Sequence, residues 1–173
     1  MKFKIIQKYD VWIIFLFTAC TFTLLKLQQF HYFIGVNAEL IDWYETTLWN
    51  FLNGKIFIAN HNIPLFSEHF SPIIIFLLPV YYLFQSPYCF VVIHALVCAL
   101  AIIPLYHLTA HYFENRFVPI GICLTYFFSR TVNYGLMFDF HLEVFYPLLL
   151  FCILLFYTKE KWSLFYIFII LCL

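Results

Sequence analysis

Long apolar stretches are the feature that most constrains what this chain can fold into. Residues 11–28, 88–111 and 117–134 are almost free of charged side chains, and each is close to the ~20 residues that a membrane-spanning helix needs. Only 10% of all residues are charged, against about 25% in soluble domains. The sequence therefore predicts an all-α, polytopic helical membrane protein.

The charges between these stretches predict how the chain crosses the membrane. Lys2, Lys4 and Lys8 precede the first stretch, and the positive-inside rule places them in the cytoplasm. We expect a multi-pass protein of the cell inner membrane with a cytoplasmic N-terminus and a retained signal anchor. The expected layout is span 1 at 11–28, an outer loop at 29–87 with interfacial helices at 39–53 and 72–84, span 2 at 88–111, span 3 at 117–134, an outer loop at 135–143, span 4 at 144–158 and an incomplete span 5 at 163–173.

The run from Ile73 to Phe84 decides between two topologies. It has about a dozen residues and contains Pro79, so it is too short to cross a ~30 Å hydrocarbon core. If it did cross, Arg116 and Lys159 would lie outside, against the positive-inside rule. In the preferred layout one membrane face collects the following residues: Glu39, Asp42, Glu45, Glu68, His69, Asp139, His141 and Glu143.

The segment from Phe138 to Glu143 is the strongest candidate for chemistry. Asp139, His141 and Glu143 offer oxygen and nitrogen ligands for a divalent cation such as Mg²⁺ or Mn²⁺, or a carboxylate base with a tuning neighbour. The simpler alternative is that Asp139 caps the next helix and Glu143 answers its dipole.

Each of the remaining polar residues has a simple structural explanation beside a functional one. Asp42 and Glu45 share one face of the amphipathic helix expected at 39–53 and could simply be solvated, as could Glu68 and His69 in their loop. Arg130 could snorkel to the interface or pair with an acidic group or lipid phosphate. Lys26 is expected to snorkel, and His94 is expected to be structural.

Net charge and cysteines exclude other classes. Nine basic and nine acidic side chains cancel, so nothing favours nucleic acid. The six cysteines lie in apolar runs without a CxxC pair and are expected to be packing residues.

Several short strings resemble one family of bacterial membrane proteins, domain of unknown function 2079. They are Leu48-Trp49-Asn50 with Gly54, His69-Phe70-Ser71-Pro72, Pro79 with Leu83-Phe84 and Ser86-Pro87, and Phe138-Asp139-Phe140-His141 with Glu143. The chain departs from the family at Glu39 to Glu45, where it lacks the usual Asp-Leu-Gly, and at Leu142, where the family usually has Pro. Members usually run several spans further, and the chain ends in an apolar run, which implies a truncated N-terminal part.

The layout also resembles the start of GT-C glycosyltransferases, which take a sugar from a polyprenyl-phosphate carrier, usually with a divalent metal. That resemblance implies transfer to an extracytoplasmic acceptor, with the bilayer and a polyprenyl-phosphate-linked sugar as partners. It implies Asp42 or Glu45 as general base, Asp139, His141 and Glu143 as metal ligands, and Glu68, His69 and Arg130 as substrate contacts. The rivals are a transporter or channel, a non-catalytic membrane protein, and an inactive fragment.

Overall fold

The computed structural model describes residues 2–32, 39–68 and 72–172, and the described part is all-helical. Its main helices, in chain order, are α1 (Lys2–His31), η1 (Leu40–Glu45), α2 (Thr46–Leu52), α3 (Leu65–Glu68), η3 (Pro72–Leu77), α4 (Leu78–Phe84), α5 (Pro87–Leu100), α6 (Ile102–Tyr112), α7 (Phe117–Phe128), α8 (Arg130–Met137), η4 (Leu142–Phe145), α9 (Tyr146–Thr158) and α10 (Trp162–Cys172). A short 3-10 turn, η2 (Asn60–Asn62), lies in the loop before α3.

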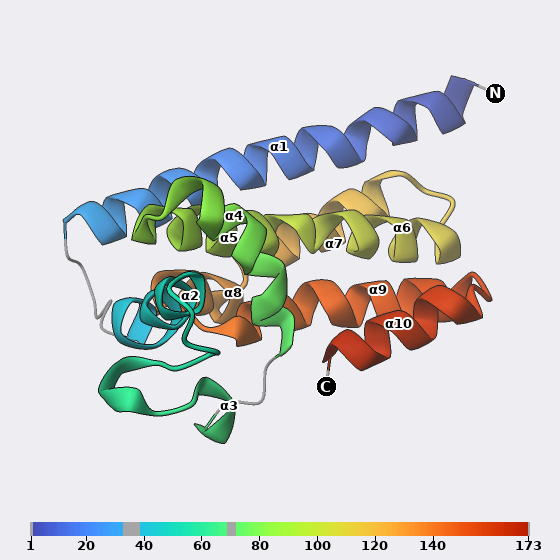
Figure 1. Cartoon of the computed structure of the whole chain (residues 1–173). Helices are drawn as coiled ribbons and strands as arrows, with labels where there is room; N and C mark the ends of the chain where they lie inside the picture. The colour runs from blue at the N-terminus through green and yellow to red at the C-terminus, as the bar shows by residue number, and fades with distance from the viewer. Residues whose placement is uncertain (1, 33–38, 69–71, 173) are drawn as a thin grey trace.

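Two long apolar helices form the centre of the bundle. Helix α1 packs along α5 and α6, which follow one another and run in the opposite direction (Figure 1). The stretches Tyr9–His31 and Pro87–Tyr112 are each long and apolar enough to cross a membrane. Helices α7 and α9 pack against α6, and α10 packs against α9.

The stretch expected as span 2, at 88–111, has a one-residue irregularity in the middle, where Ala101 between α5 and α6 keeps right-handed helical dihedrals (φ −57°, ψ −24°). Helix α5 ends at Leu100 and α6 begins at Ile102. Pro104 explains the irregularity, because it has no N–H to donate to the Leu100 carbonyl and its ring crowds that group.

The stretch expected as one span at 117–134 is instead two helices, α7 and α8. Ser129 separates them with an extended ψ of 127°. The side-chain amide of Asn133 donates to the carbonyls of Phe127 (2.7 Å) and Ser129 (2.9 Å). The chain can therefore turn here without leaving those carbonyls unpaired.

Short helices cover one end of the bundle. Leu40, Tyr44 and Leu48 are buried at four-residue spacing along η1 and α2, which fits the amphipathic pattern of that segment. The helix ends before Gly54, whose φ of +84° suits glycine. The apolar stretch Pro72–Phe84 is shorter than the two long helices and contributes Ile74, Leu77 and Tyr81 to the same core.

The opposite end carries the basic turns. The N-terminus, the α6–α7 turn and the α9–α10 turn lie together there, away from α2 and α8 (Figure 1). Arg116 in the α6–α7 turn pairs with Asp10 of α1, with 2.9 Å between Nη2 and Oδ1. This contact fixes the start of α1 against the α6–α7 turn.

Candidate functional site

The segment 138–141 is held in place by one buried aromatic ring. Phe140 is fully buried and meets Tyr44, Phe90 and His94 in edge-on contacts, with ring centroids 5.2–5.8 Å apart. Such edge-on pairs add to the free energy gained from burial alone. Phe140 thereby joins the segment to η1 and α5.

Two polar side chains of α1 hold the preceding backbone. Lys26 donates to the Phe138 carbonyl, and Gln29 donates to the Met137 carbonyl at 2.6 Å. Lys26 is only 1% exposed and lies near enough to Asp139 for their charges to attract. The expectation that Lys26 snorkels is therefore wrong: burial with a carbonyl and a carboxylate nearby offsets the loss of hydration.

Asp139 links the two segments that the sequence placed in separate outer loops. It is 4% exposed, and its Oδ2 accepts the Glu39 backbone N–H at 2.9 Å. Its Oδ1 accepts the N–H of Phe140 at 2.7 Å. The carboxylate thus sits at the start of η1, where the helix dipole favours negative charge, and it does not cap the helix that follows it.

His141 lies between two glutamates from different segments. Its Nε2 is 2.8 Å from Oε2 of Glu39, and its Nδ1 is 3.6 Å from Oε2 of Glu143. The Glu39 contact is an ion pair without the alignment of a directional hydrogen bond. The histidine is about one-quarter exposed and the two glutamates are about half exposed, so solvent reaches this row of three side chains.

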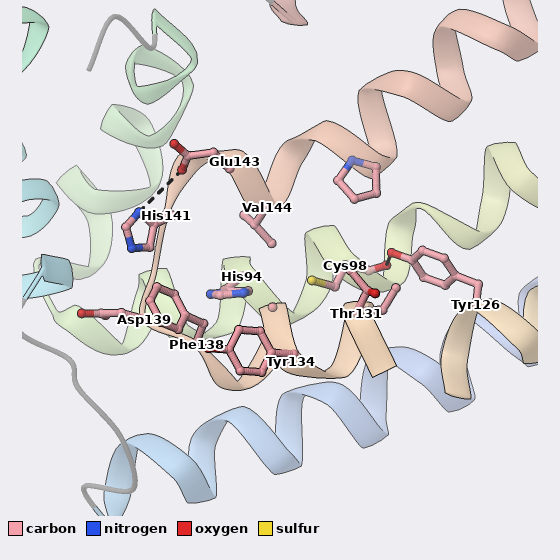
Figure 2. A pocket seen from close by; sticks show the side chains of 13 residues that line it. His94, Cys98, Tyr126, Thr131, Tyr134, Phe138, Asp139, His141, Glu143 and Val144 are labelled. Atoms are coloured by element: carbon pink, nitrogen blue, oxygen red, sulfur yellow. Dashed lines mark hydrogen bonds and ion pairs between the residues drawn. The ribbon is translucent and has the colours of Figure 1, made fainter. Parts of the chain in front are cut away.

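A cavity of about 480 Å³ opens beneath this row (Figure 2). Its polar edge comes from Asp139, His141 and Glu143, and its deeper wall includes the buried side chains of Cys98 and Tyr126. The volume is in the range of ordinary small-molecule sites.

One polar side chain lies inside that wall. His94 of α5 is 1% exposed and lines the cavity, and Figure 2 shows its ring between Phe138 and Cys98. Neither ring nitrogen has a hydrogen-bond partner of good geometry among the described residues, although the Gly135 backbone is near enough to interact.

Comparison with known proteins gives one family. The family described as "Predicted membrane protein (DUF2079)" matches residues 43–173. The chain belongs to this family. The matched range of this DUF2079 member includes every residue that lines the cavity, whereas Lys26 and Glu39 precede it. Searches of curated proteins and of solved structures found no match.

The two expected catalytic acids of this DUF2079 member lie outside the cavity lining. Asp42 is exposed, and the Asn60 side chain lies 3.4 Å from its Oδ1. Glu45 accepts from the Tyr81 hydroxyl at 3.3 Å. Burial raises the pKa of Glu45, and the Tyr81 hydrogen bond opposes part of that rise. The acid that does meet the 139–143 segment is Glu39.

Of the expected substrate contacts, only Arg130 has a described side chain. Arg130 is the first residue of α8, is exposed, and is not among the cavity-lining residues. Glu68 is the last residue of α3, and the structure describes its backbone only. His69 lies outside the described residues.

The three expected metal ligands are neighbours but do not converge. Both Asp139 oxygens accept backbone N–H groups, and the two nitrogens of His141 face different carboxylates. Within the described part of the chain, no group of three or more His, Cys, Asp or Glu side chains is arranged to hold a metal ion. The residues as placed do not fit a divalent cation.

Sequence reasoning missed the two most informative buried groups. Lys26 and His94 each lie inside a long apolar stretch, and their sequence neighbours contain no acid. The only available signal was the rule that an ionisable residue inside a membrane stretch marks a functional site by default.

Proposed function

We propose that this DUF2079 member acts as a GT-C-like membrane glycosyltransferase, which moves a sugar from a polyprenyl-phosphate donor to an extracytoplasmic acceptor. The observation that carries the proposal is the row Glu39, His141 and Glu143 at the edge of a largely apolar cavity. A lipid-linked substrate needs an apolar wall beside titratable groups that water and an acceptor can reach.

The reaction requires a base for the acceptor hydroxyl. The acceptor oxygen forms a bond to the anomeric carbon, the bond from that carbon to the phosphate oxygen breaks, and the phosphate leaves with the electron pair. In this proposal Glu143 accepts the proton of the acceptor hydroxyl, because it lines the cavity and is about half exposed. His141 Nδ1 lies 3.6 Å from this carboxylate, which is longer than a hydrogen bond, so His141 acts on Glu143 through its charge when it is protonated.

The other roles predicted from the sequence have less structural support than Glu143 as base. Asp42 and Glu45 as base would require an acceptor on the far side of η1, outside the cavity lining. A divalent Mg²⁺ or Mn²⁺ ion remains a prediction from the sequence, and no step above uses it.

The test compares acids that line the cavity with one that does not. The full chain in liposomes is supplied with a radiolabelled polyprenyl-phosphate sugar, and sugar transfer is measured for wild type, Glu143→Gln and Asp42→Asn. We expect Glu143→Gln to lose on the order of 10²-fold in turnover and Asp42→Asn to retain it. Far-ultraviolet circular dichroism establishes that each variant is helical.

Two results would overturn the proposal. Wild-type turnover in Glu143→Gln would remove Glu143 as base, and loss in Asp42→Asn alone would return that role to the acid expected from the sequence. A chain that transfers no sugar in liposomes would contradict the transferase itself.

A transporter is the second candidate, favoured by one observation. Lys26 and His94 are both buried within the two long apolar helices, and buried ionisable groups there often belong to ion pathways. Ion flux into the same liposomes separates the two functions. Flux that is lost in Lys26→Met, without any sugar transfer by wild type, would support the transporter.

A further inference from the structure

We infer that His94 marks a binding subsite for an uncharged hydroxyl group, inside a cavity that takes an amphiphile with an alkyl chain. No part of this inference depends on sugar transfer, since it concerns what occupies the cavity.

The cavity is large and mostly apolar. About 480 Å³ is many times the ~30 Å³ share of one water molecule, so the cavity has room for an organic ligand. Most of its lining is apolar, with Val132, Phe138, Val144 and Pro147 around the opening between α8 and α9. An alkyl chain gains hydrophobic free energy from such a wall.

A second feature of the cavity is the unused hydrogen-bonding capacity of His94. The other deep polar group, the Tyr126 hydroxyl, already donates to the Cys98 carbonyl at 2.9 Å. Neither nitrogen of His94 has a partner of such good geometry among the described residues, and only a poorly aligned contact with the Gly135 backbone stands against burial of 99% of the ring. A buried polar group without a good partner is unfavourable, so a ligand that pairs with it binds more tightly than one that cannot.

The burial of His94 also bears on the charge of that ligand group. His94 is buried in an apolar wall, and burial favours the uncharged form of an imidazole. A neutral imidazole has one donor and one acceptor nitrogen. A hydroxyl group also donates and accepts, and it therefore matches either nitrogen. A charged group would lose its hydration in this apolar wall, which an uncharged hydroxyl does at a lower cost.

The test uses three probes of equal chain length: 1-dodecanol, dodecane and dodecyl phosphate. The full chain in lipid nanodiscs carries ¹⁵N-histidine, and each probe is titrated as a mole fraction of the lipid. We expect dodecanol to shift the His94 ring nitrogens and dodecane to leave them unchanged. A His94→Gln spectrum assigns the signal.

Matched variants measure how much His94 contributes to the affinity for dodecanol. Phenylalanine keeps a flat ring against Phe140, so His94→Phe should bind dodecanol about three- to tenfold more weakly, which is the value of one hydrogen bond. His111→Phe is the control, because His111 is an exposed histidine on the next helix, α6. Dodecane should bind His94→Phe as it binds wild type.

A second pair of variants tests the cavity itself. A Cβ added at Gly135, which lines the cavity, meets no atom within 4 Å, and the same holds for Gly121 of α7, which is not among the lining residues. Gly135→Leu should weaken binding of dodecanol and dodecane alike, and Gly121→Leu should change neither.

Three outcomes would overturn the inference. Equal dodecanol affinity in His94→Phe and wild type would show that the imidazole is not a contact. Tighter binding of dodecyl phosphate that depends on His94 would make the subsite one for anions. Unchanged ring nitrogens at saturating dodecanol would leave His94 outside the bound ligand's reach.

Discussion

At the scale of single residues, Asp139 is the carboxylate on which the site depends. It receives the Glu39 N–H and the Phe140 N–H while it attracts Lys26. A buried carboxylate is tolerated only when it is paired in this way. The residue therefore acts as a connector between α1, η1 and the 138–143 segment.

Replacing Asp139 with Asn should destabilise the protein by about 1–3 kcal/mol, because the neutral amide pairs less well with Lys26 and its amino end cannot accept an N–H. Asp42→Asn is the control, since Asp42 is exposed and should change stability by less than about 0.5 kcal/mol. Denaturant unfolding in mild detergent, followed by circular dichroism, measures both. Equal stability of Asp139→Asn and Asp42→Asn would contradict the connector role.

The sequence identified Asp139, His141 and Glu143 as a group but could not assign their partners. Local spacing shows that three polar side chains are neighbours along the chain. It does not show that Glu39 would lie 2.8 Å from His141, because that contact joins residues about 100 positions apart. Lys26 was misjudged for the same reason, since its carbonyl partner is 112 residues away.

At the scale of helices, η1 and α4 are joined by the contact between Glu45 and Tyr81. The pKa of Glu45 is raised by burial. A carboxyl with a raised pKa favours the folded state below its ordinary value of about 4.3 and loses that contribution as pH rises through the folded value. Ionised Glu45 therefore weakens the attachment of η1 to α4 near neutral pH.

Glu45→Gln should raise the thermal midpoint at about pH 7, because a neutral amide oxygen still accepts from Tyr81. The gain should shrink toward zero below about pH 3, where wild-type Glu45 is protonated in both states. Differential scanning fluorimetry across that pH range makes the comparison, and Tyr81→Phe reports the hydrogen bond separately. A lower midpoint for Glu45→Gln at pH 7 would contradict this account.

Helix content was predictable from the sequence, whereas the break at Ser129 was not. Apolar length and composition predicted an all-helical chain, which the described residues confirm. The break at Ser129 depends on an Asn133 amide that reaches back to two carbonyls, and a hydropathy pattern carries no information about that reach. The irregularity before Pro104 could have been expected from the proline alone.

At the scale of the whole molecule, the two ends differ in chemistry. Arg116 and Lys159 lie in the turns after α6 and α9, and these turns are at the end of the bundle away from α2 and α8 (Figure 1). Glu39 precedes η1, and Asp139, His141 and Glu143 follow α8, so these residues lie at the other end. Such separation is what the positive-inside rule predicts for a protein with its N-terminus in the cytoplasm.

Site-directed thiol labelling tests this orientation in intact cells. Lys55→Cys and Glu114→Cys place new thiols at exposed positions at the two ends, and the parent chain gives the background from its six cysteines. An impermeant maleimide should label Lys55→Cys directly and Glu114→Cys only after permeabilisation. The reverse pattern would invert the orientation, and labelling of both from one side would contradict the arrangement of the helices.

The Lys26 contact also bears on how the chain is made. Lys26 is synthesised 112 residues before Phe138, the residue whose carbonyl it meets. At typical translation rates that interval is on the order of ten seconds, and an ammonium group without its partner is costly in hydrocarbon. We therefore expect Lys26 to stay near water or the insertion machinery during those seconds, and α1 to reach its final depth only after the end of α8 has been made. In that case the first helix of the chain takes its final position later than its place in the sequence suggests.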